Sequence, residues 1–256
     1  MRIAAVAVLA LFLASAAHAQ EEAATPRAIF QRHIDASGGA AAHEAVTTQR
    51  HTGHVESAAM PGREVPITIL VKAPSTMRVV VDLGNLGKII QAADADAGWS
   101  LDPFSGANIT PDADRLFMQR GVDTLSMIDP QTPYEDLTLA AREDVETPTG
   151  PVPCDRVDFT LNGVQMSEWF AVDSGLRIKR AVTFEGDFGP EERAILYLDW
   201  KPVGDGGLLV PHSSPQQAMG ADISVIIERV ELNPSDLPAD AFDVPEAVRE
   251  KMSAVE

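Results

Sequence analysis

Hydrophobic and polar residues alternate along most of the chain after residue 64, with the period of two that is typical of strands half-buried in a sheet. The alternation is clearest over 65–71 and 77–83, which are separated by the turn residues Ala73-Pro74-Ser75. It returns in the second half of the chain, over 157–161, 176–185, 196–200, 208–210 and 223–227. We count about eleven strands from this pattern, arranged as an antiparallel meander with one apolar face.

Helical periodicity is confined to a few segments. Thr25-Pro26 offers an N-cap and a proline at the first helical position, and Gly38-Gly39 ends the apolar stripe that follows. A second short helix is expected over 40–46. Thr110-Pro111-Asp112 begins a third helix, which Gly121 ends. No strand is predicted between Ser105 and Asp136, so we interpret this excursion as a lid or plug over the sheet.

The first residues have the three parts of a cleavable secretory signal. Arg2 supplies the positive charge, residues 3–14 form a short apolar core, and Ala17-His18-Ala19 is a small-x-small cleavage site. The apolar core is shorter than the roughly 20 residues of a membrane span. We therefore expect a signal peptide over 1–19, cleaved after Ala19, and a single soluble periplasmic domain over 20–256. A buried N-terminal helix is the alternative.

The charge of the chain limits its partners. Its formal net charge is −18, whereas affinity for nucleic acid comes largely from Lys and Arg on phosphates. We expect no nucleic-acid partner and at most a transient contact with a membrane. Cys154 is the one cysteine, so no intramolecular disulfide can form, and a buried structural thiol is expected there.

The sequence offers little catalytic or metal-binding chemistry. It has no G-x-S-x-G elbow, phosphate-cradling glycine loop or H-E-x-x-H motif. His51 and His54 are three residues apart on a strand and should face opposite sides, which disfavours a shared metal. Asp94-Ala95-Asp96 begins like a calcium loop, but a hairpin turn explains it better. His212 is expected to be structural. We predict no catalytic residues, no metal site and no cofactor.

What remains is a concentration of adaptable apolar side chains in and around the excursion. Methionine and aromatic side chains adapt well to irregular apolar ligands. The candidate residues of a lipid-binding cleft are Trp99, Phe104, Leu116, Phe117, Met118, Leu125 and Met127. The alternative is that these residues simply form the core.

The order of short motifs resembles a known superfamily. After the leader come Ser37-Gly38-Gly39, a strand with Gly53, Lys72-Ala73-Pro74, Gly98-Trp99 and Asp102-Pro103. Later come Cys154-Asp155-Arg156-Val157, Val172-Asp173-Ser174-Gly175-Leu176, Leu198-Asp199-Trp200-Lys201-Pro202, Val210-Pro211-His212 and Asn233-Pro234. This order is similar to that of the LolA/LolB-like superfamily, particularly its outer-membrane lipoprotein-sorting proteins.

The resemblance implies a mainly β fold with a few helices: a curved antiparallel sheet that forms an unclosed β-barrel, its concave side plugged by helices. It also implies a cavity for acyl chains and no catalytic residues to carry over. The function expected is therefore a periplasmic carrier of a lipid, lipoprotein or other amphiphile, exchanged with a membrane-bound donor or acceptor protein. Two alternatives stay open: a regulatory sensor that binds a partner protein, and a hydrolase with an unrecognised site.

Overall fold

The computed structural model describes residues 24–186, 189–218 and 221–254. The signal peptide predicted over residues 1–19 and its cleavage site lie outside the described residues. Within those ranges, no helix is both long enough and apolar enough to cross a membrane.

One antiparallel sheet of fifteen strands makes up most of the molecule. Along the sheet the order is β6-β5-β4-β3-β2-β1-β15-β14-β12-β11-β10-β9-β7, with β13 on β14 and β8 on β9. The first half contains β1 (Thr48–Ser57), β2 (Val65–Lys72), β3 (Thr76–Asp82), β4 (Lys88–Ala93), β5 (Gly98–Asp102) and β6 (Gly106–Ile109). The second contains β7 (Tyr134–Leu139), β8 (Glu143–Thr147), β9 (Gly150–Leu161), β10 (Val164–Ala171), β11 (Arg177–Gly186) and β12 (Gly189–Leu196). Between them lie β13 (Leu198–Val203), β14 (Leu208–Ala218) and β15 (Ala221–Leu232).

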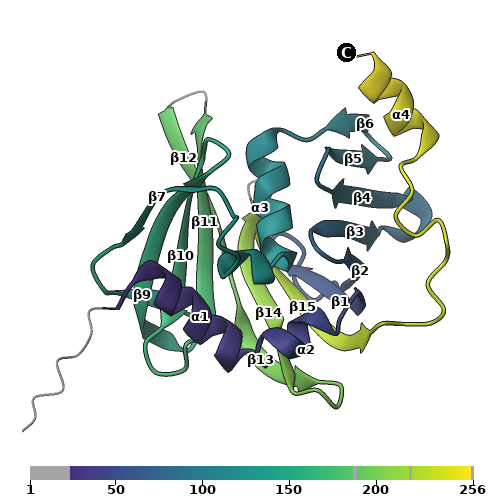
Figure 1. The fold of residues 1–256 in the computed structure, drawn as a ribbon. Helices are drawn as coiled ribbons and strands as arrows, with labels where there is room; N and C mark the ends of the chain where they lie inside the picture. The colour runs from purple at the N-terminus through teal and green to yellow at the C-terminus, as the bar shows by residue number, and fades with distance from the viewer. Residues whose placement is uncertain (1–23, 187–188, 219–220, 255–256) are drawn as a thin grey trace, which may run out of the picture.

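The sheet curves around a helix but its two ends do not pair (Figure 1). The helix on the concave side is α3 (Asp112–Val122), which is followed by the short 3₁₀ helix η2 (Leu125–Met127). The mainly β fold class and the unclosed β-barrel are therefore confirmed. The expectation of about eleven strands was too low, because fifteen are present.

The missed strands explain that shortfall. β6 and β7 lie at the two ends of the sheet path, and most of their side chains are exposed on both faces. They therefore lack the alternation of apolar and polar residues that marks a half-buried strand. The expectation that residues 105–136 contain no strand is wrong, since β6 and the start of β7 fall inside this range.

The helices begin and end close to where their capping signals predict. The hydroxyl of Thr25 caps α1 (Pro26–Ala36) by accepting a hydrogen bond of 3.2 Å from the Ala28 amide. The short helix α2 (Ala40–Glu44) follows the two glycines. The C-terminal helix α4 (Glu246–Ser253), which the sequence pattern did not predict, packs against β5 and β6.

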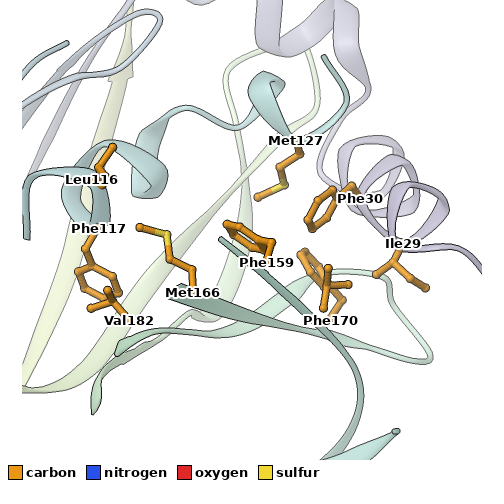
Figure 2. Packing of buried hydrophobic residues seen from close by; sticks show 10 residues of the cluster. Ile29, Phe30, Leu116, Phe117, Met127, Phe159, Met166, Phe170 and Val182 are labelled. Atoms are coloured by element: carbon orange, nitrogen blue, oxygen red, sulfur yellow. The ribbon is translucent and has the colours of Figure 1, made fainter. Parts of the chain in front are cut away.

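The largest core cluster joins α1, α3 and η2 to the inner faces of β9, β10 and β11 (Figure 2). Phe30 of α1 stacks edge-on against Phe159 and Phe170, with ring centroids 6.2 and 5.7 Å apart. Burial of a side chain of this size contributes about 1.5–3 kcal/mol. This cluster fixes α1 on the second half of the sheet and holds one side of α3 against it.

The two halves meet where β1 pairs with β15, and Gly53 permits this close approach. A Cβ atom at residue 53 would lie 1.9 Å from the carbonyl oxygen of Ile226. The pairing register shifts between Thr52 and Gly53, which is a β-bulge. Any larger residue would push the two strands apart.

Candidate functional site

A cavity of about 1600 Å³ occupies the concave side of the sheet, and residues of α3 form part of its wall. Surveyed small-molecule pockets span about 300–1,000 Å³, so this cavity has room for a large or elongated ligand. It is open to solvent along part of its length. Figure 1 shows α3 standing between the two halves of the sheet.

Aliphatic side chains of the first half form much of the wall. The alternation of the strands places every second residue of β2 and β3 on the inner face. The inward residues are Val65, Ile67, Ile69 and Val71 of β2 and Met77, Val79 and Val81 of β3, joined by Ile223, Val225 and Ile227 of β15. These side chains make an extended apolar surface, which α3 meets along β3, β4 and β5 and which lines the cavity elsewhere.

Three of the predicted cleft residues line this cavity. Phe117 and Met118 lie on α3, and Leu125 begins η2. Phe117 also belongs to the main core cluster and is 6 % exposed, so it contributes to both the cavity wall and the core.

Trp99 lies on the other face of the sheet. Its neighbour Ser100 lines the cavity, and successive residues of a strand point to opposite faces. Trp99 packs against Ala92 and Val248, the latter from α4, and is 2 % exposed. We therefore leave it out of the candidate site.

The remaining predicted cleft residues are also outside the cavity wall. Leu116 of α3 and Met127 of η2 are buried in the main core cluster, where Figure 2 shows both side chains extending from these helical segments. Phe104 is at the tip of the turn between β5 and β6 and is 70 % exposed. The core alternative thus describes Leu116 and Met127 better than the cleft interpretation.

Sequence reasoning missed the polar part of the cavity wall. Arg177, Arg180, Tyr197 and Trp200 line it together with the apolar residues. The sequence contained a signal that Arg180 points inward. Arg180 precedes the buried Val182 by two residues on β11, and residues two apart on a strand share a face. This signal was missed since an arginine on a strand is normally assigned to the solvent face.

A buried ionic cluster lies behind this polar wall. Glu168 of β10 is fully buried, and its two carboxylate oxygens accept from Arg120 Nε at 3.0 Å and Arg120 Nη2 at 3.2 Å. Arg177 Nη1 donates to the same carboxylate at 3.2 Å. Burial opposes the charge on Glu168, but the guanidinium groups of Arg120 and Arg177 outweigh it and lower the pKa of this carboxyl.

Two histidines near the cavity are held neutral. His33 of α1 is 1 % exposed, and its Nδ1 accepts from the amide of Arg177 at 3.2 Å. Burial, reinforced by the charge of Arg177, lowers the pKa of His33 to about 3. His51 of β1 is at the cavity wall, where burial lowers its pKa to about 4.

His51 and His54 face opposite sides of β1, as their spacing predicts. His51 lines the cavity, whereas His54 Nδ1 lies 3.0 Å from Glu228 Oε1 on the outer face. On that face, potential ligand atoms of His54, Glu56 and Glu64 lie within 4.8 Å of one another. The prediction that the protein holds no stoichiometric metal is therefore best tested here, by metal analysis of the wild type and of His54→Ala.

The two residues that could have suggested a hydrolase have structural surroundings. Cys154 is fully buried, and burial followed by the nearby Asp155 raises the pKa of its thiol to about 12. His212 is 8 % exposed, with Nδ1 2.9 Å from the Val210 carbonyl oxygen. Asp94 and Asp102 likewise close hairpin turns, each accepting from two backbone amides that follow it.

Comparisons with known proteins extend this description. No family model matches the sequence, and no curated protein matches it. A LolA superfamily protein from Nitrosomonas europaea superimposes with a TM-score of 0.54, covering 87 % of this chain and 99 % of the other, at 12 % identity. The fold is LolA-like. A DUF1329 family protein from Desulfovibrio piger gives a TM-score of 0.57 over 88 % of this chain and 100 % of the other, at 11 % identity.

At these identities the likeness concerns the fold. It agrees with the fold expected from the short motifs, and it covers 87–88 % of this chain. The ligand-facing residues of this chain must be judged from its own cavity.

Proposed function

We propose that this LolA-like chain is an exported, periplasmic binding protein that carries a lipid, lipoprotein or other amphiphile in its concave cavity. The observation that carries the proposal is the cavity of about 1600 Å³, whose wall is largely aliphatic and is open on one side. Apolar surface of this extent gains free energy when it is covered, at about 25 cal/mol per Å². A folded carrier would receive such a ligand from one membrane-bound partner and deliver it to another.

Binding rather than catalysis fits the chemistry of the wall. Its histidines His33 and His51 are held neutral by burial, and the Cys154 thiol is buried away from it. The cavity therefore serves, in this proposal, to shelter apolar chains from water.

The test is mass spectrometry of an organic extract of the protein, purified without detergent from the envelope of its native organism. We expect copurified lipid in near-stoichiometric amount. We also expect the intact mass of the protein to match a chain that begins at Gln20. A matched pair of variants supplies the control. Val79→Trp fills the cavity from β3, whereas Val80→Trp places the same side chain on the opposite face of that strand.

Lipid should be lost from Val79→Trp and retained by Val80→Trp. Equal lipid in both variants would place the binding elsewhere. A wild type that carries no lipid, and that binds no amphiphile added to it, would contradict the proposal.

A further inference from the structure

The buried ionic cluster on the second half of the sheet contains more positive than negative charge. Glu168 is the one carboxylate at its centre, and Arg120, Arg177 and Arg180 surround it. Arg120 donates to both of its oxygens, and Arg177 donates to Oε1. Arg180, directly opposite Glu168 on the neighbouring strand, has no hydrogen bond to it.

Arg180 is a buried cation, and two of its three guanidinium nitrogens lack an acceptor within the part of the chain that the structure describes. It is 3 % exposed, and among the described residues nothing accepts a hydrogen bond from its Nε or Nη1. Its guanidinium carbon lies 4.1 Å from the centroid of the Phe117 ring. A Cβ on Gly121 would lie 3.1 Å from both terminal nitrogens of Arg180, so the group is held close against the backbone of α3.

Aromatic stacking offsets only part of the cost of burying this charge. Cation–π contacts contribute about 0.5–2 kcal/mol, whereas a buried charge without hydrogen-bonding partners costs several times more. Tyr197, which also lines the cavity, has a buried hydroxyl without a partner among the described residues. Two polar groups at one wall thus have unused hydrogen-bonding capacity.

Acidic side chains also line the cavity, but they are engaged or exposed. Asp114 is paired with Arg193, Asp123 accepts from the Ser126 amide at 3.2 Å, and Asp102 closes a turn. The remaining ones, Glu44, Glu191 and Glu192, are exposed. With a net charge of −18 for the whole chain, the buried arginines form a local exception.

We propose that the cavity takes an amphiphile with an anionic head group, a carboxylate or a phosphate, which accepts hydrogen bonds from Arg180 and Tyr197 while its chain covers the aliphatic wall. This inference rests on the proposed function and adds the ligand class to it. Guanidinium groups suit such oxyanions because their N–H donors match the geometry of two acceptor oxygens. The apolar chain and the head group would then bind to different parts of one cavity.

The experiment compares ligands that share a ten-carbon chain: decanoate, decyl phosphate and 1-decanol, each titrated by calorimetry into the full mature chain. Inorganic phosphate and acetate are titrated alone to measure the head group without the chain. We expect both anionic amphiphiles to bind about tenfold or more tightly than 1-decanol, because a hydrogen bond to a charged group stabilises more than a neutral one. The free anions should bind far more weakly than either amphiphile.

Arg180→Met keeps an apolar stem of similar length and removes the charge. We expect it to reduce the preference for the anionic amphiphiles to less than about threefold and to leave the affinity for 1-decanol unchanged. The ligand-free variant should also melt higher by at least about 2 °C, since an uncompensated charge is gone. Arg229→Gln, which removes an exposed arginine from the outer face, should change neither quantity.

Each contrary result has a distinct meaning. Equal affinity of the wild type for decanoate and 1-decanol overturns the head-group inference and leaves the carrier function standing. Failure to bind any of the three amphiphiles overturns both. Equal affinity for inorganic phosphate and decyl phosphate would show a site for free anions, which also overturns the inference. A lower melting temperature for Arg180→Met, with the preference retained, would assign Arg180 to structure alone.

Discussion

On the inner face of β10, Met166, Glu168 and Phe170 are 0–2 % exposed and packed beneath helices. On the inner face of β3, by contrast, Val79 and Val81 are half-buried and line the cavity. Both strands alternate in the same way, so alternation alone does not distinguish them. What differs is the cover: α1, η2 and the aromatic side of α3 pack on the second half, whereas the other side of α3 meets β3, β4 and β5 and much of the inner face there lines the cavity. We call these the packed half (β9–β11) and the open half (β1–β6).

The comparison indicates that the two halves of one continuous sheet have different roles, one in stability and one in ligand binding. The packed half has the closely packed aromatic core and the buried ion pairs, and so stabilises the fold. The open half keeps apolar surface available to a ligand, which a fully packed core cannot do. Substitutions should therefore affect stability mainly in the packed half and binding mainly in the open half.

The largest expected effect is on the buried carboxylate of the packed half. Glu168→Gln leaves Arg120 and Arg177 buried without a counter-charge, which should lower the free energy of unfolding by about 3–5 kcal/mol. Urea denaturation measures this. Asp236→Asn is the control at the surface, because it breaks the exposed pair with Arg50 of β1 and should lower the free energy of unfolding far less. Similar costs for both variants would contradict the comparison.

The next effect concerns acid stability. The pKa of His33 is lowered by burial from 6.5 to about 3, so the unfolded chain binds a proton between these values while the folded chain does not. Stability is therefore complete above about pH 6.5 and falls as the pH drops, by about 1 kcal/mol per pH unit. His33→Gln should flatten this decline in urea denaturation between pH 6.5 and 4. His51→Gln, at the wall of the open half, should flatten it to a similar extent down to about pH 4, where the pKa of His51 lies, and less below that pH.

Much of the fold was predictable from the sequence, and the reasons are local. Strand alternation, as at Val65, Ile67 and Ile69, depends on residues a few positions apart in the sequence, and so does the helix cap at Thr25-Pro26. The cavity was harder to predict, because which face of a strand meets a helix depends on long-range packing. Trp99 illustrates this: the hairpin turn before it was predicted, but its face is decided by α4, nearly 150 residues later along the chain.

The polar wall could not have been recognised from local pattern either. Arg120 lies on the buried side of α3, yet its partner Glu168 is 48 residues away in sequence. The missing acceptors for Nε and Nη1 of Arg180 can be recognised only when the surroundings of this side chain are known. Sequence alternation predicts which residues share a face, but it does not tell whether a charge on that face has found a partner.

A third prediction uses one substitution in both halves. Val182→Trp forces a large side chain into the packed half, where Val182 is fully buried, and overpacking should cost about 1–3 kcal/mol or more. Val79→Trp enters the open cavity and should change the free energy of unfolding by less than about 1 kcal/mol while weakening amphiphile binding at least tenfold. Thermal melts and calorimetric titration measure the two quantities. Equal destabilisation would mean that the open half is as tightly packed as the other.

The smallest effect is spectroscopic and tests which tryptophan is next to the ligand. Trp200 lines the cavity, and its ring lies 5.7 Å from that of His33, whereas Trp99 is enclosed beneath α4 on the other face of the sheet. Emission from an indole responds to the polarity of its surroundings, and only Trp200 should lose contact with water when a chain enters. We expect amphiphile binding to shift the emission of the wild type and of Trp99→Phe, and to leave that of Trp200→Phe nearly unchanged. Calorimetry on the same variants should show binding in all three, so that a silent spectrum cannot be mistaken for a lost site. A response that disappears with Trp99 instead would place the ligand on the outer face, beside α4, and would reverse the roles assigned to the two faces of the open half.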